Sequence, residues 1–501
     1  MQPIIPTSKQ LLRSSISSVL RSIIHAFVLF VVYPIYINNL GTEIFGVWVM
    51  VGVIIGWSQI GSLGIPQTIM KFAAGAAAKG NKKELIEYVS SSLTVILFSG
   101  IMILFLLFIV KDTIVNIFQV PLTIKLSMPL YVILAGLIVV VSFIAQTING
   151  ILSGIGRMDI ANINDITGKI IGSIVSVALI LKGYGIFGLL IGSMSECVII
   201  LVVASIISIL SLGFNPYNIK FIKKGRIKET VFFGGTLSIS SLFAMFLEPF
   251  NRFILGQYVG LSTATVYDVA SRVVSQVRGI LEAAFRSFVP QSSVYYSMGY
   301  KNKLRDMSNR SVSFICIFGV PILLTLIIWS PELISMWLRI EMQDITYAVR
   351  IIAFSSIFSL MVSPAYYLFI GIGNNYICFC VYIILSMLNF ILVLLSLLFG
   401  YINLKLVVNI FSLSLLISSL YLMRESYMEF GERYLLNIRN MYIIVLFFIC
   451  MSLFKIIGVL CNFQNIMAIL LILFSFILYF VICYVFNLIP VNYIKSHMLS
   501  K

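Results

Sequence analysis

Residues 89–110 read VSSSLTVILFSGIMILFLLFIV, a run of apolar and small residues without a single charged side chain. A helix needs about 20 mostly apolar residues to cross the hydrocarbon core of a bilayer. This run has that length and composition, so it is predicted to be a transmembrane helix.

Segments of the same kind recur along the whole chain of 501 residues, of which 60% are hydrophobic and only 10% are charged. Typical soluble domains are about 25% charged, so nearly all of this chain must lie in lipid or against other apolar surfaces. The composition predicts an all-α, polytopic membrane protein and argues against a soluble enzyme. About 14 transmembrane helices are expected, at approximately 18–37, 44–66, 89–110, 129–152, 165–181, 184–208, 231–256, 263–288, 311–330, 348–371, 375–399, 403–423, 441–461 and 465–488.

The lysines and arginines between these segments are strongly biased to one side of the predicted topology. With the N-terminus placed inside, most of the 34 Lys and Arg residues fall on the inner side. Cytoplasmic loops of membrane proteins carry such an excess, so both termini are predicted to be cytoplasmic. The outer side holds only Lys111, Lys125, Lys182, Arg339 and Lys405, and the segments themselves contain Arg252, Arg272, Arg278, Arg286, Arg350 and Lys455.

Neither a signal peptide nor a cysteine motif changes the prediction of a polytopic membrane protein. Residues 1–18 are polar, and the apolar run that follows contains Tyr33 and Pro34 without a small-residue cleavage site, so no cleavable signal peptide is expected. The seven cysteines lie in or at the ends of apolar runs and form no CxxC pair. We interpret them as buried apolar residues and expect neither a metal site nor a disulfide framework.

A basic stretch separates the sixth predicted helix from the seventh. Within 212–230 the sequence reads KFIKKGRIK from Lys220 to Lys228. Such a cluster is typical of a cytoplasmic anchor on anionic headgroups, and less often helps to recruit an acidic headgroup. We expect 212–230 to link an N-terminal lobe of six helices (1–211) to a C-terminal lobe of six more (231–424), with two additional helices in 425–501.

The two predicted lobes share weak internal similarity. The hairpin NLGTEIFGVW at 39–48 aligns with YVGLSTATVY at 258–267, and IPQT at 65–68 is echoed by VPQS at 289–292. Both copies follow an even number of predicted helices, so they share one expected orientation in the membrane. A parallel repeat implies a pseudo-two-fold axis along the membrane normal, with a central cavity between two six-helix lobes.

The eighth predicted segment carries charge along one face. At about 100° per residue, the polar residues between Asp268 and Arg286 fall within about 120° of arc, opposite an apolar face. A charge at mid-bilayer costs at least about 2.5 kcal/mol, so this stripe must face a bundle interior or a wet cavity. Ion pairs absorb part of that cost but leave one arginine in excess, which favours a solute pathway. The expected i,i+4 pairs are Asp268–Arg272, Arg278–Glu282, Glu282–Arg286 and, in the seventh segment, Glu248–Arg252.

Arg21 and His25 add a polar face to the inner half of the first segment. Arginine binds phosphate oxygens through two parallel hydrogen bonds, and histidine titrates near neutral pH. A cationic cavity lined by such residues favours an anionic solute that carries phosphate, although a satisfied polar residue is the simpler alternative for His25. The predicted cavity lining is Arg21, His25, Glu248, Arg252, Asp268, Arg272, Arg278, Glu282 and Arg286, with no catalytic residue and no metal ligand.

Several short motifs resemble those of a known transporter family. They are LGTEIFGVW at 40–48, GSLGIPQ at 61–67, LSGIGR at 152–157 and LGQYVG at 255–260. On these motifs the chain resembles the polysaccharide-exporter branch of the multidrug/oligosaccharidyl-lipid/polysaccharide (MOP) exporter superfamily. More narrowly, it resembles the Wzx-type O-antigen repeat-unit flippases.

This resemblance implies a MATE-like fold and the flipping of a polyprenyl (undecaprenyl)-pyrophosphate-linked oligosaccharide. The movement would run from the inner to the outer leaflet of the bacterial inner (cytoplasmic) membrane, by alternating access, for the biosynthesis of O-antigen, lipopolysaccharide, capsule or another surface polysaccharide. The implied partners are the lipid-linked oligosaccharide, membrane lipids and the polysaccharide polymerase machinery, and no nucleic acid. No cofactor is implied, and coupling to H⁺ or Na⁺ through Glu248, Asp268, Glu282 or His25 stays open.

Other transporter and enzyme classes fit less well. An ion-coupled drug antiporter of the MATE branch is the leading alternative, but it would favour a net acidic cavity for cationic drugs. A major-facilitator sugar transporter would carry an Asp-Arg signature after the second helix, where this chain reads KFAAG at 71–75. A membrane glycosyltransferase or polymerase would bring a large loop with carboxylates, whereas the longest loop expected here is short and basic.

Overall fold

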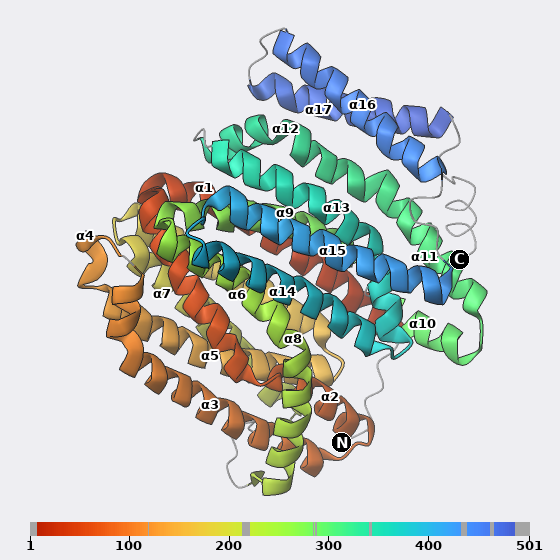
Figure 1. Cartoon of the computed structure of the whole chain (residues 1–501). Coiled ribbons are helices and arrows are strands. Elements are labelled where there is room, and N and C mark those ends of the chain that lie inside the picture. The colour runs from red at the N-terminus through yellow and green to blue at the C-terminus, as the bar shows by residue number, and fades with distance from the viewer. Residues whose placement is uncertain are drawn as a thin grey trace. The chain divides into compact units, whose positions relative to one another are not determined.

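The computed structural model describes residues 8–118, 120–212, 221–283, 285, 288–339, 343–431, 438–460 and 465–485. All regular elements within these ranges are helices and none is a strand, which confirms the predicted all-α fold (Figure 1). The chain forms two compact units, Met1–Asp268 and Val269–Lys501.

The first unit consists of long helices joined by short turns. They are α1 (Ser8–Ser58), η1 (Gln59–Ser62), α2 (Ile65–Ala78), α3 (Lys82–Ile117), α4 (Leu122–Lys125), α5 (Met128–Gly154), α6 (Met158–Leu181), α7 (Gly185–Leu212) and α8 (Lys224–Tyr258). Helix α9 (Leu261–Ala283) begins in the first unit and ends in the second.

The second unit has the same character. Its remaining elements are α10 (Phe288–Ser297), α11 (Lys301–Phe314), the π-helical turn η4 (Ile315–Gly319), α12 (Val320–Leu338), α13 (Gln343–Gly371), α14 (Asn375–Leu398), α15 (Leu404–Phe430), α16 (Ile438–Leu460) and α17 (Asn465–Val485).

Eleven of the described helical stretches are long and apolar enough to cross a membrane, so the chain is a multi-pass membrane protein. One of them, Ile16–Ala77, folds back on itself at Gly41, where φ is 76° and ψ is 163°. Glycine adopts this positive φ without strain. As a result the rings of Tyr33 and Phe45, on either side of the bend, lie 5.4 Å apart. Because α8 and α9 are not among the eleven, the number of 14 crossings stays a prediction.

Several helices extend beyond the apolar segments that predict them. Helix α3 starts at Lys82, about two turns before residue 89, and a single helical stretch runs from Lys301 to Leu338. Lys, Arg and Glu are good helix formers, so they continue a helix past the end of its apolar core. For the same reason α8 begins at Lys224, within the basic stretch 212–230 that the sequence predicts as a linker.

Close packing of α6 against α7 depends on glycine. A Cβ atom on Gly172 would lie 2.6 Å from the Cβ atom of Glu196 and 2.7 Å from the backbone oxygen of Gly192. These distances are too short for any side chain, so only glycine permits the observed approach of the two backbones. The packing brings Glu196 of α7 beside Lys169 of α6.

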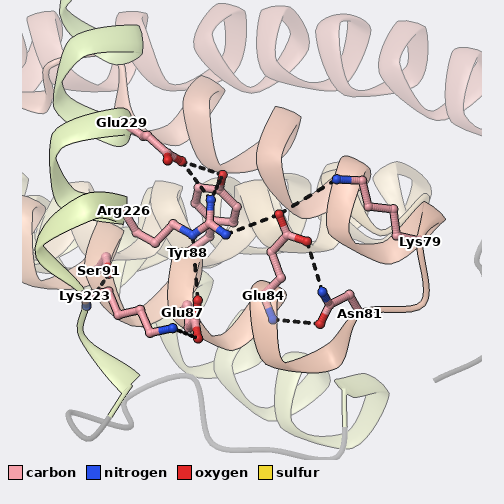
Figure 2. Close-up of polar contacts among 9 residues, drawn as sticks. All are labelled: Lys79, Asn81, Glu84, Glu87, Tyr88, Ser91, Lys223, Arg226 and Glu229. Atoms are coloured by element: carbon pink, nitrogen blue, oxygen red, sulfur yellow. Dashed lines mark hydrogen bonds and ion pairs between the residues drawn. The ribbon is translucent and has the colours of Figure 1, made fainter.

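Arg226, in the first turn of α8, ties this helix to α3 (Figure 2). Its Nη1 donates to the Tyr88 hydroxyl at 2.6 Å and to Oε2 of Glu229 at 2.9 Å. Its guanidinium lies over the Tyr88 ring, with Cζ 4.4 Å from the centroid. Glu84 and Glu87 of α3 are within ion-pair distance, at 3.5 Å and 3.7 Å. One arginine is therefore surrounded by acceptors from two helices.

The neighbours of these residues complete a charge-balanced set (Figure 2). Glu87, whose side chain is only 5% exposed, also pairs with Lys223. Glu84 pairs with Lys79 at 3.9 Å, and its backbone N–H donates to Asn81 at the start of α3. We call Glu84, Glu87, Tyr88, Lys223, Arg226 and Glu229 the Arg226 cluster.

The C-terminal helices α16 and α17 pack on the rest of the second unit through α12 (Figure 1). Lys455 of α16 pairs with Glu332 of α12, and its Nζ lies 4.8 Å from the centroid of the Trp329 ring. Tyr479 of α17 donates to the backbone oxygen of Ile317, within η4, at 3.1 Å. Polar contacts therefore anchor this apolar pair of helices.

Candidate functional site: charged networks within the membrane helices

Arg21 of α1 pairs with a carboxylate on another helix. Its Nη1 lies 2.7 Å from Oδ2 of Asp165 in α6, and the Arg21 side chain remains 33% exposed. Asn149 of α5 donates from Nδ2 to Oδ1 of Asp165 at 2.8 Å. Asp165 is therefore held by two helices, while part of the Arg21 side chain lies at the surface of the first unit.

A second ion pair joins α6 to α7. Nζ of Lys169 lies 3.1 Å from Oε2 of Glu196, and the two side chains are 32% and 25% exposed. Lys169 lies close to the centre of α6, about 17 Å from either end of the helix at about 1.5 Å per residue. A partly exposed ion pair therefore lies near the middle of a helix long enough to span the bilayer.

His25 lies one turn from Arg21 in α1 and close to both ion pairs. The charged groups that act on its ring are Lys169, Arg21 and Glu196, and the backbone of Asp165 forms a hydrogen bond with it. Its Nε2 is buried and has no hydrogen-bond partner among the described residues. The two ion pairs Arg21–Asp165 and Lys169–Glu196 each combine one cation with one carboxylate, so this part of the predicted cationic lining is electrically balanced.

Three of these residues, Asp165, Lys169 and Glu196, are absent from the predicted cavity lining. They occur in segments without a long charged stripe of the kind that marks the eighth segment. Charge alone is the signal that identifies them, because ionisable residues inside transmembrane helices are rare and usually functional. Their pairing depends on the packing of α6 against α1 and α7, which spacing along a single helix does not reveal.

Arg252 and Asp268 lie in the interior of the first unit. The residues are only 6% and 1% exposed, and Nε of Arg252 lies 2.9 Å from Oδ1 of Asp268. The Tyr33 hydroxyl donates to Oδ2 of Asp268 at 2.8 Å. Glu248, which is more exposed, lies 2.7 Å from Nη2 of Arg252, so this predicted i,i+4 pair is confirmed. The network joins α1, α8 and α9.

The predicted lining residues Arg272, Arg278 and Glu282 lie on the part of α9 that belongs to the second unit. Nε of Arg278 and Oε1 of Glu282 are 3.1 Å apart, which confirms the predicted i,i+4 pair. Their side chains are 28% and 24% exposed, and Arg272 is half-buried with polar contacts of its own. Arg286, and with it the predicted Glu282–Arg286 pair, lies outside the described residues.

The composition of these networks resembles no metal centre. Within the described part of the chain, no group of three or more His, Cys, Asp or Glu side chains lies close enough to hold a metal ion. The networks instead pair cations with carboxylates at ion-pair distance.

Residues 11–295 match the model of a family described as polysaccharide biosynthesis protein. The chain belongs to this family. It is also 23% identical, over 308 residues, to a protein of Shigella flexneri described as a putative O-antigen transporter. The matched region covers 60% of this chain and 70% of that protein. The predicted resemblance is therefore confirmed at the level of the family.

Solved structures of transporters share the fold of this family member. The lipid II flippase MurJ, in an inward closed conformation, matches with a TM-score of 0.69 and 15% identity over 94% of this chain and 98% of that one. An inward-facing multidrug resistance MATE family transporter of the MOP superfamily matches with a TM-score of 0.64 and 15% identity, over 84% and 98% of the two chains. The protein is thus a helical membrane protein with a MurJ/MATE-like fold.

Proposed function

We propose that this protein is a flippase that carries a polyprenyl (undecaprenyl)-pyrophosphate-linked oligosaccharide from the inner to the outer leaflet of the bacterial cytoplasmic membrane. The product would enter O-antigen, capsule or another surface polysaccharide. The observation that carries the proposal is a set of partly exposed ion pairs, Arg21–Asp165 and Lys169–Glu196 on spanning helices and Arg278–Glu282 on α9. In a polysaccharide biosynthesis family, that set fits a polar passage through an apolar protein.

The energetic argument rests on exposure. A charged side chain at the centre of a bilayer costs at least about 2.5 kcal/mol, so surfaces that present several of them are normally wet. Lys169 and Glu196 lie near the middle of their helices and are a quarter to a third exposed. Water along such a surface would also hydrate the hydroxyl groups of an oligosaccharide that otherwise has to enter hydrocarbon.

The types of side chain suit the substrate. Guanidinium and ammonium groups bind phosphate oxygens, and carboxylate and amide groups accept or donate hydrogen bonds to sugar hydroxyls. Within the first unit, Arg21 and Lys169 would contact the pyrophosphate, while Asp165 and Glu196 would contact sugar. Arg252 and Asp268 are buried, so they would hold the helices that surround the passage rather than line it.

We propose alternating access as the mechanism, with both termini in the cytoplasm. His25 lies within reach of the charges of Lys169, Arg21 and Glu196, and its Nε2 has no hydrogen-bond partner among the described residues, so it is the residue of the first unit most suited to carry a coupling proton. Protonation of a neighbouring carboxylate would release Arg21 or Lys169 for the pyrophosphate, and deprotonation would return it to its carboxylate.

The test compares cells with and without the protein. Polyprenyl-linked oligosaccharides are extracted after spheroplasts have been treated with a membrane-impermeant glycosidase, which cuts only intermediates on the outer leaflet. Without the protein, the intermediate should accumulate in a protected form on the inner leaflet. An unchanged distribution between leaflets would reject the flippase.

Ion-coupled antiport of a small molecule is the second candidate. The electrical balance around His25 favours it over a strongly cationic passage, because a neutral network does not select anions. If leaflet distribution is unchanged and the protein instead lowers the cellular content of a cationic dye in a pH-dependent manner, this second function replaces the first.

A further inference from the structure

Pro331 interrupts the hydrogen bonding of α12 in the second unit. Proline has no backbone N–H, so the carbonyl of Ile327, four residues earlier, lacks its usual helical partner. Arg350 of α13 donates from Nε to this carbonyl at 3.0 Å and to Oγ of Ser330 at 2.9 Å. The proline thus creates the acceptor that fixes the Arg350 side chain against α12.

These contacts use only the Nε edge of the Arg350 guanidinium. An arginine has five N–H donors in a planar fork, and four of them belong to the two Nη groups. No carboxylate among the described residues pairs with Arg350, and the side chain is partly exposed. The guanidinium is therefore oriented by a neutral acceptor while its charge and most of its donors remain available.

Toward the start of α13, further polar groups lie on the same side of the helix as Arg350 and pair with no carboxylate among the described residues. Tyr347, one turn before Arg350, donates from its hydroxyl to Oδ1 of Asn409 in α15 at 2.9 Å. Nζ of Lys405 lies 5.6 Å from the centroid of the Tyr347 ring. Asp344 is the nearest carboxylate along α13, but it lies about 120° around the helix from Arg350. We call Tyr347, Arg350, Lys405 and Asn409 the α13 strip, which carries two cations and no carboxylate.

The side chains of the α13 strip are partly or fully exposed in the second unit. Arg350 lies about 10 Å along α13 from its first residue, in a helix long and apolar enough to span a bilayer. Phe354, one turn further along the same side, is 50% exposed. A cation at this depth needs a counter-charge, and the described part of the protein does not supply one.

We propose that the α13 strip binds an oxyanion of the phosphate class, with Arg350 as the fixed fork and Lys405 as a second positive charge near the end of the helix. Guanidinium groups bind phosphate oxygens in pairs, and preorganisation by Ile327 and Ser330 reduces the entropy lost on binding. Two sources present this chemistry at such a depth: the diphosphate of a polyprenyl-linked substrate and the headgroup of a membrane phospholipid. Only the first source rests on the proposed function.

The experiment uses the full-length protein in phosphatidylcholine nanodiscs and a benzophenone-bearing polyprenyl diphosphate as the photoprobe. Labelled peptides are mapped by mass spectrometry to α13 and α15. We expect labelling of these helices in the unmodified protein, a loss of about tenfold in Arg350→Ala, as for removal of charge-assisted hydrogen bonds, and a partial loss in Arg350→Lys. Arg424→Ala, which removes an exposed arginine already paired with Glu425, is the matched control and should leave labelling unchanged.

Pro331→Ala separates binding from folding. Alanine at position 331 supplies a backbone N–H that donates to the carbonyl of Ile327 and so competes with Arg350 for this acceptor. Labelling should therefore fall, while thermal stability stays equal or rises. Repeating the labelling with phosphatidylglycerol in the nanodiscs identifies the source. Persistent labelling assigns the strip to the diphosphate, and labelling abolished by phosphatidylglycerol assigns it to lipid headgroups.

Absence of labelling on α13 and α15, or labelling that Arg350→Ala does not reduce, would overturn the proposal. The labelling result does not depend on the leaflet assay. Failure of the oxyanion site and failure of the flippase function can therefore be told apart.

Discussion

Arg226 and Arg350 are both arginines fixed in place by a neighbouring helix, but their surroundings differ. Arg226 meets three carboxylates and a tyrosine, which neutralise its charge and occupy its donors (Figure 2). Arg350 meets one backbone carbonyl and one serine, neither of which is charged. A satisfied arginine is part of the scaffold, whereas an oriented arginine without a counter-charge is poised for a ligand.

The partly exposed ion pairs fall between these two cases. Lys169–Glu196 and Arg278–Glu282 are paired, as in the Arg226 cluster, but each side chain keeps about a quarter of its surface accessible. Such pairs are able to exchange partners with a solute. The comparison therefore predicts that mutations at exposed pairs affect transport, whereas mutations at the Arg226 cluster affect stability.

The largest effect is expected at Arg278 of α9 and at Arg286, which lies outside the described residues. Arg278→Ala and Arg286→Ala should each abolish export in the leaflet assay, because each removes a cation from the proposed passage. Membrane insertion, followed by the amount of protein in the membrane fraction, should stay normal. Lysine at either position should restore part of the export, since it keeps the charge but loses the paired hydrogen bonds. Normal export by both alanine variants would contradict a cationic passage that depends on these two arginines.

Lys169→Ala should reduce export at least about tenfold, equivalent to about 1.4 kcal/mol. The exchanged variant, Lys169→Glu with Glu196→Lys, distinguishes transport from structure because it rebuilds the ion pair with reversed polarity. We expect protein levels to recover in the exchanged variant while export does not. Full recovery of export would show that the pair only holds α6 against α7.

Arg226→Ala should act on stability instead. Glu87 is almost fully buried and would lose one of its two cationic partners among the described residues, and a hydrogen bond to a charged group contributes about 1.5–3 kcal/mol. The thermal midpoint of the purified protein, measured by intrinsic fluorescence, should fall by several degrees. Tyr88→Phe, which loses only the hydroxyl contacts, should cost about 1 kcal/mol.

Arg424→Ala provides the control for this measurement. Arg424 is 70% exposed and pairs with Glu425, and such surface pairs contribute about 0–1 kcal/mol. Equal midpoints for the Arg226 and Arg424 variants would contradict a scaffold role for the Arg226 cluster.

The smallest effect concerns pH. The hydroxyl of Tyr88 and the guanidinium of Arg226 hold the pKa of the Glu229 carboxyl below its ordinary value of 4.5. A lowered pKa in the folded state contributes stability that is complete above the ordinary value and is lost as the pH falls through the folded value. The midpoint difference between the unmodified protein and Glu229→Gln should therefore be constant from about pH 8 to about pH 5, and shrink only below pH 4.5. A difference that shrinks near neutral pH would contradict a lowered pKa of Glu229 in the folded protein.

Much of the molecule follows from the order of its residues alone. Apolar runs such as 89–110 determine the helices, because an unpaired backbone is too costly in hydrocarbon. The bend at Gly41 and the turn between α6 and α7 lie where the predicted segments end. The pairs Glu248–Arg252 and Arg278–Glu282 are also predictable, since residues four apart share one face of a helix.

Contacts between helices are decided only by tertiary structure. Charge and spacing mark Arg252 and Asp268 as possible members of one lining, yet packing buries them together and leaves Lys169 and Glu196 partly exposed. Arg350 counts as one more intramembrane cation in the sequence, and only the neighbouring turn around Pro331 gives its side chain an orientation. The physical reason is that periodicity along one helix determines which residues share a face, whereas partner and exposure depend on what the next helix places opposite that face.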